Sequence, residues 1–235
     1  MSRDTCQTRR SLIAAGAAGV GLLLVEPVRF ALAASKEEKT REGIGPVEDL
    51  MREHGVLRRV LLIYDEVIRR LDAGKDLPPG VVADAAGVIR RFVEDYHEKN
   101  EEQEIFPRLE KAGKLVELVK VLYAQHRASR GLTEVVLTSS TPAALANAES
   151  RRRLGEALRR FTRIYRPHAA REDTVLFPAF RSLVSPKEFA ALGEKFENKE
   201  HELFGEEGFE KMVNQVAGLE KKLGIYDLSQ FTSTL

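Results

Sequence analysis

The sequence predicts an all-α protein, an up-down four-helix bundle with additional C-terminal helices. From residue 47 the apolar positions alternate in steps of three and four, as on one face of a helix. Gly, Pro and Ser/Thr clusters separate the long periodic segments. No alternating Val/Ile/Thr run bounded by turns indicates a strand. Four long helices joined by short loops place neighbours antiparallel, which predicts the bundle.

The bundle helices are expected at about residues 47–72, 81–106, 115–137 and 148–177. Pro107 and Pro178 are expected to interrupt the second and the fourth of them, because proline has no amide hydrogen to donate. Two more helices, at about 186–204 and 208–223, must then pack outside the bundle or across one end.

Residues 1–33 have the three parts of an export signal. Paired arginines, Arg9 and Arg10, precede a short apolar run at 13–25, and Ala31-Leu32-Ala33 forms a small-x-small cleavage site. The signal resembles the twin-arginine type, which predicts a bacterial protein exported to the periplasm or another extracytoplasmic space. An uncleaved membrane anchor is the alternative, although spanning a bilayer needs roughly 20 apolar residues. Cleavage removes Cys6, the single cysteine, and with it any thiolate ligand.

Three further segments follow the signal: a linker at 34–45, the bundle at 46–183 and a C-terminal helical extension at 184–235. The charge is nearly balanced, with 37 Lys and Arg against 36 Asp and Glu, and no basic block stands out. We therefore expect no nucleic-acid partner, and no membrane partner once the signal is removed.

An internal repeat contains four of the five histidines. Residues 97–101 read HEKNE and residues 168–172 read HAARE, so each motif holds a His and a Glu four residues apart. Phe-Pro follows each motif, at the ninth and tenth residues after the histidine. A lone histidine precedes each motif: His54 comes 43 residues before His97, and His126 comes 42 residues before His168. The chain therefore reads as two copies of one helical hairpin.

Each His–Glu pair lies on the apolar stripe of its helix, because residues four apart share a face. The rows read Val93-His97-Glu101-Ile105 and Ile164-His168-Glu172-Leu176. A carboxylate without a partner is costly in an apolar interior. Two cations, each held by two histidines and bridged by both glutamates, would satisfy all six side chains. The alternative is four separately bonded core histidines, with the glutamates protonated or paired with arginine.

Imidazole and carboxylate ligands without thiolate favour iron, with manganese second, over structural zinc. A zinc-protease HExxH motif is absent, since residues 97–101 end in Glu. A ferritin-like site needs two ExxH motifs. Only Glu94 to His97 fits, because Tyr165 stands at the matching position of the second motif.

At these residues the sequence resembles the hemerythrin-like (HHE cation-binding) family over about 46–183. The resemblance implies a non-heme centre of two iron ions, bridged by two carboxylates and an oxo or hydroxo group. The ligands it implies are His54, His97, Glu101, His126, His168 and Glu172.

Oxygen-carrying hemerythrins have HxxxH on the third helix and HxxxxD on the fourth. Here Arg130 stands four residues after His126, and the carboxylate comes four residues after His168. We therefore expect reaction with H2O2 or NO rather than reversible O2 carriage. A module that binds, stores or senses iron, O2 or NO without turnover remains the alternative, so an enzymatic activity stays open.

Other residues near the motifs have several possible roles. Tyr64, Tyr123 and Tyr165 could hydrogen-bond, ligate, carry an electron or simply fill the core, and His201 is expected at the surface or at a helix cap. Glu98 and Glu102 each follow a predicted ligand by one residue, so both are expected to point towards solvent.

Overall fold

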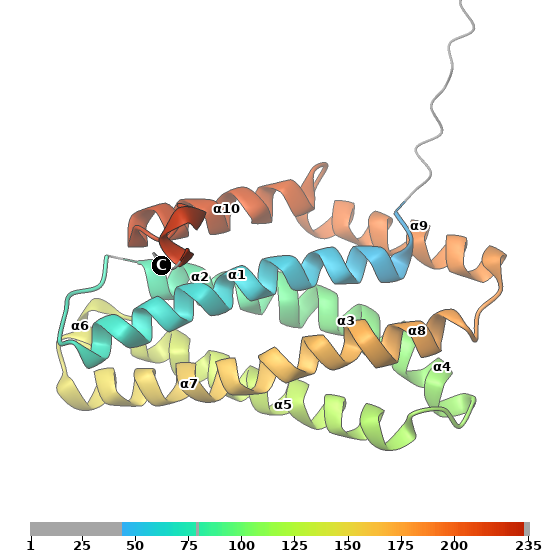
Figure 1. Ribbon diagram of the computed structural model, residues 1–235, viewed down its shortest axis with the longest axis horizontal. Helices are drawn as coiled ribbons and strands as arrows, with labels where there is room; N and C mark the ends of the chain where they lie inside the picture. The colour runs from blue at the N-terminus through green and yellow to red at the C-terminus, as the bar shows by residue number, and fades with distance from the viewer. Residues whose placement is uncertain (1–43, 79, 233–235) are drawn as a thin grey trace, which may run out of the picture. The chain divides into compact units, whose positions relative to one another are not determined.

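A computed structural model describes residues 44–78 and 80–232, so the predicted export signal and all but the last two residues of the predicted linker lie outside it (Figure 1). Helices make up all the regular structure of the described residues, which confirms the all-α prediction. None of these helices combines the length and the apolar character needed to cross a membrane.

Four antiparallel helical stretches form the bundle (Figure 1). The first is α1 (Pro46–Asp72). The second is continuous and comprises α2 (Val81–Val88), η1 (Ile89–His97), α3 (Glu98–Asn100), η2 (Glu101–Ile105) and α4 (Phe106–Lys111). The third is α5 (Val116–Ser139), which the short α6 (Pro142–Leu145) follows. The fourth comprises α7 (Ala148–Arg171), η3 (Glu172–Leu176) and α8 (Phe177–Arg181).

Neighbours in this ring pack in the order α1, α7, α5, then α2 with η1, which returns to α1. The C-terminal helices α9 (Pro186–Phe204) and α10 (Gly208–Leu223) lie outside the ring against α1, and α10 also contacts α2. A short 3-10 turn, η4 (Leu228–Phe231), follows them. The predicted extension is therefore helical and packs on the outside of the bundle.

Neither proline interrupts its helix, so both predicted interruptions are wrong. A π-helical turn precedes each proline, η2 before Pro107 and η3 before Pro178. In these turns the amide of Phe106 donates to the carbonyl of Glu101, and that of Phe177 to Glu172, five residues back. The wider spacing of the hydrogen bonds in these turns tolerates a residue that donates none, so the helix continues through each proline.

Two apolar clusters fill the bundle, one towards each end. Leu57 and Val93 belong to one cluster, whereas Leu50 and Ile105 belong to the other. His54 lies between Leu50 and Leu57 on α1, so the polar side chains of the repeat occupy the level between the two clusters. The fold thus carries the predicted ligands into the middle of the bundle, away from water.

Candidate metal centre

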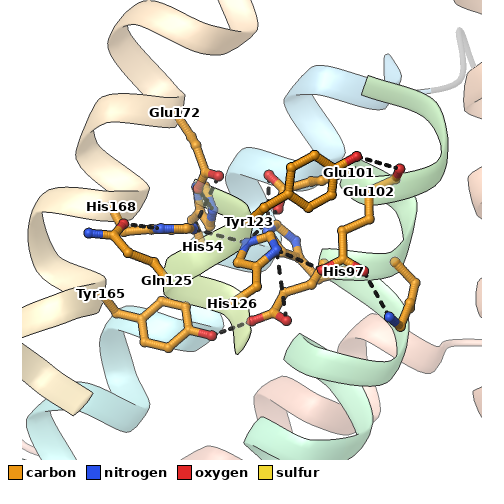
Figure 2. Close-up of polar contacts among 12 residues, drawn as sticks. His54, His97, Glu101, Glu102, Tyr123, Gln125, His126, Tyr165, His168 and Glu172 are labelled. Carbon is orange, nitrogen blue, oxygen red and sulfur yellow. Dashed lines mark hydrogen bonds and ion pairs between the residues drawn. The ribbon is translucent and has the colours of Figure 1, made fainter. Parts of the chain in front are cut away.

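All six predicted ligands meet in the middle of the bundle, with at least one from each helical stretch (Figure 2). Each is at most 3% exposed. They are His54 on α1, His97 at the end of η1, Glu101 at the start of η2, His126 on α5, His168 on α7 and Glu172 at the start of η3.

The histidines form two pairs. The rings of His54 and His97 have centroids 4.7 Å apart. Those of His126 and His168 are 4.9 Å apart, and their Nε2 atoms are separated by 3.2 Å. Each pair joins one histidine from each kind of position in the repeat, a lone His and an HxxxE His.

Each glutamate reaches both histidine pairs. Glu101 places Oε1 3.6 Å from Nε2 of His97 and Oε2 3.5 Å from Nε2 of His126. Glu172 places Oε1 3.1 Å from Nε2 of His168 and Oε2 3.4 Å from Nε2 of His54. Both carboxylates therefore lie between the pairs, which is where bridging ligands would stand.

The donor atoms fit cations better than they fit one another. Ligand atoms of Glu101, His126, His168 and Glu172 lie within 4.8 Å of one another, as do those of His54, His97 and Glu101. Within the described part of the chain, all four oxygens of the two glutamates are buried without a hydrogen-bond partner. Among the described residues, no Arg or Lys pairs with either glutamate, contrary to the alternative of separately satisfied side chains. Cations between the carboxylates and imidazoles would satisfy these atoms.

The other ring nitrogen of each histidine has a hydrogen-bond partner. Nδ1 atoms lie 2.6 to 3.1 Å from side-chain oxygens, in the pairs His54 with Asp173, His97 with Glu53, His126 with Glu102, and His168 with Gln125. An Nδ1–H donated outwards leaves the Nε2 lone pair directed at the centre, as a metal-bound imidazole requires.

The sequence model of the hemerythrin HHE cation-binding domain family matches residues 45–180, and a second, overlapping match covers residues 117–226. The chain belongs to this family. It is 52% identical to the uncharacterized proteins Rv1995 of Mycobacterium tuberculosis and Mb2018 of Mycobacterium bovis over 185 residues, which is 79% of this chain and 72% of each relative. No solved structure matches the chain.

Phe-Pro, the other part of the repeat, also belongs to the HHE centre. Phe106 stacks on His126 with ring centroids 5.6 Å apart, and Phe177 stacks on His54 at 5.7 Å. Each phenylalanine thus covers the lone histidine of the opposite hairpin. Because both rings are fully buried, they close the apolar side of the centre to water.

Sequence reasoning missed the residues that support the histidines. Glu53 and Gln125 directly precede the lone histidines, whereas Glu102 and Asp173 directly follow Glu101 and Glu172, the predicted bridging ligands. The available signal was the presence of a carboxylate or amide at the same place in both copies of the repeat.

The prediction that Glu98 and Glu102 face solvent is wrong. Glu98 is fully buried, accepts a hydrogen bond from the Tyr165 hydroxyl and lies 2.6 Å from Arg130. Glu102 accepts from Arg130 at 2.8 Å as well as from His126. The flanks of a bundle helix face its neighbours, so a residue one step beyond a ligand is still covered by protein.

Protonation of the metal-free HHE centre is uneven. Burial and the neighbouring Glu172 raise the pKa of Glu101 well above its usual range. Burial also acts on Glu172, but the His168 and His54 imidazoles hold its pKa well below the usual range. Burial lowers the pKa of His126 to about 4. Adjacent buried carboxylates resist ionising together, and a cation would remove this conflict.

The remaining candidates lie outside the ligand set. The Tyr165 hydroxyl is directed at Glu98, and the Tyr123 hydroxyl donates to the backbone carbonyl of Glu102 at 3.3 Å (Figure 2). Tyr64 lies ten residues beyond His54 on α1, about 15 Å along the axis. The exposed His201 on α9 lines a separate cavity of about 740 Å³ between α1, α9 and α10.

Proposed function

We propose that this HHE protein binds two iron ions, one at His54 and His97 and the other at His126 and His168. Glu101 and Glu172 would be shared between them. The observation that supports this most directly is that each carboxylate reaches one imidazole of each pair and, in the part of the chain that the structure describes, has no other partner. The imidazole and carboxylate donor set favours iron, with manganese second.

We infer that the iron-loaded protein reacts with peroxide or nitric oxide. Two imidazoles and two shared carboxylates would offer each metal four protein ligands, fewer than the six of an octahedral iron site. Arg130, four residues after His126, pairs with Glu98 and Glu102 and offers no ligand atom. Positions left open on both ions would suit the binding of a small molecule, and bound iron would supply the redox chemistry.

The burial of the centre supports a small molecule as the reactant. With every ligand residue at most 3% exposed, a bulky organic substrate has no access to the ligand atoms. The same burial favours the second candidate function, a module that binds iron, O2 or NO without turnover. A covered centre limits the exchange of bound molecules with the solvent.

Export by the twin-arginine route is the remaining part of the proposal. Its support is the sequence at Arg9 and Arg10, the apolar run and the cleavage site. This route carries folded proteins, which suits a metal centre that is filled in the cytoplasm before export.

Iron content and reactivity test the proposal together. Protein purified with iron available should hold about two irons per chain, in line with two His pairs that share their carboxylates. Mixing the reduced protein with O2 in a stopped-flow instrument should give rapid, irreversible oxidation. Added peroxide should then be turned over repeatedly without another reductant, because two peroxide molecules can give one O2 and two waters.

An oxygenated form of the protein that releases O2 under vacuum would contradict the proposed reactivity and indicate an oxygen carrier. Iron binding without turnover of peroxide or reaction with NO would favour the binding module. Glu117→Ala removes an exposed carboxylate that lies outside the six predicted ligands, so this variant should keep the iron content and the reactivity of the unsubstituted protein.

A further inference from the structure

The two hairpins support their lone histidines in the same way. Arg58 and Arg130 each stand four residues after a lone histidine. Arg58 pairs with Asp173, which accepts from His54, and Arg130 pairs with Glu102, which accepts from His126. In both cases the carboxylate comes from the opposite hairpin and its charge is balanced by an arginine.

The HxxxE histidines, by contrast, have unequal support. Nδ1 of His97 lies 2.6 Å from a carboxylate oxygen of Glu53, whereas Nδ1 of His168 lies 2.8 Å from the amide oxygen of Gln125. Glu53 is 2% exposed, and among the described residues it pairs with no Lys or Arg. Within the described residues, a buried carboxylate without an arginine or lysine ion pair therefore stands behind one histidine pair, and a neutral amide stands behind the other.

Another buried carboxylate, Glu98, lies near the second pair but does not restore the balance. Its Oε2 is 3.9 Å from Nδ1 of His126, beyond hydrogen-bond distance. Arg130 is much closer to it, at 2.6 Å, and the Tyr165 hydroxyl donates to its other oxygen. The charge of Glu98 is thus taken up by these two groups rather than by the imidazole.

We propose that Glu53 and Gln125 make the two metal positions unequal, so that the His54/His97 position takes the first cation and holds it more tightly. The inference rests on the proposed binding of two metals. A carboxylate that accepts Nδ1–H makes the imidazole a stronger donor, and such outer partners change metal affinity by about 10- to 100-fold. Glu53 and Gln125 are positioning residues, since each acts through a histidine.

Titration of the metal-free protein with Co²⁺ tests this inference, with absorption spectra recording each binding step. Gln125→Glu should tighten the weaker step by about 10- to 100-fold, and Glu53→Gln should weaken the tighter step by a similar factor. The shared carboxylates couple the two binding steps, so the two affinities of the unsubstituted protein do not decide the question. The change in each affinity on substitution does.

The exchange variant, Glu53→Gln with Gln125→Glu, gives the sharpest result because it keeps the amino-acid composition of the protein and moves only the position of the carboxylate. Adding His54→Ala to the unsubstituted protein should remove the tight step. In the exchange variant, His126→Ala should remove it instead, since the order of filling is reversed.

Circular dichroism identifies variants that retain the helical bundle. If Gln125→Glu fails to fold, Glu53→Gln alone decides, because it introduces no new charge. Folded variants whose two steps stay within about twofold of the original would overturn the inference. Absence of Co²⁺ binding to the unsubstituted protein would instead overturn the two-metal proposal itself.

Discussion

Nδ1 of His54 lies 2.7 Å from Oδ1 of Asp173, although the two residues are 119 positions apart in the chain. Asp173 directly follows Glu172, so η3 carries both the predicted bridging carboxylate and the carboxylate that orients an imidazole on α1. The backbone turn that places one of them places the other.

Removal of this support is expected to weaken one metal position. Asp173→Ala should lower the metal affinity at His54/His97 by about 10- to 100-fold, whereas Asp173→Asn should retain part of it because its amide oxygen still accepts a hydrogen bond. Co²⁺ titration measures the loss. Asp72→Ala, which breaks only an exposed ion pair with Arg159, is the control. Equal affinities for Asp173→Ala and the control would refute the orienting role.

The bridging role predicts loss of iron when either shared carboxylate is removed. Glu101→Ala or Glu172→Ala should remove most of the bound iron, because each glutamate would be a donor to both proposed positions. Metal bound only by the folded state stabilises it, so the rise in melting temperature on iron loading should also disappear. Elemental analysis and thermal unfolding measure both effects. Full iron retention in the double variant, or zinc alone after purification with iron available, would show that the assignment is wrong.

Asp49 makes the stability of the metal-free protein depend on pH. Burial, followed by repulsion from Glu53, raises the pKa of Asp49 from 3.8 to about 7. The folded state therefore binds this proton more tightly than the unfolded state, and stability is lost as the pH rises from about 4 towards about 7. Asp49→Asn should therefore increase the free energy of unfolding by about 1–2 kcal/mol more at pH 8 than at pH 5.

Urea unfolding at the two pH values measures this difference. Asp84→Asn, which replaces a half-exposed carboxylate 3.7 Å from Lys222, is the control. A gain for Asp49→Asn that is the same at pH 5 and pH 8 would refute the assigned cause.

The proposed export depends on the paired arginines. Changing both Arg9 and Arg10 to Lys should keep the protein inside a host that has the twin-arginine route, with its metal still bound. Cell fractionation and iron analysis of the retained protein check both parts. Unchanged export would indicate the general secretory route or a membrane anchor.

The meeting of the six predicted ligands in the bundle was predictable because helical periodicity fixes the face on which each lies. His97 and Glu101 share a face at a spacing of four, and the repeat brings His168 and Glu172 to the equivalent place. The two C-terminal helices were also predictable, since Pro186 and Gly208 mark where they begin.

The rest depends on contacts that periodicity does not describe. Continuation of the helix through Pro107 requires a local change to π-helical hydrogen bonding, which the apolar pattern does not reveal. Burial of Glu98 depends on Arg130 and Tyr165 from two other helices. Such partners come together only in the folded bundle.

The interlocking of the hairpins has a consequence for the order of folding. The contact between His54 and Asp173 closes a loop of 119 residues, and the entropy of closing it opposes the contact until the helices have associated. Metal capture should then follow the main folding barrier. Interactions that form after the transition state act on the unfolding rate, so iron should prolong the lifetime of the native bundle while leaving the refolding rate almost unchanged.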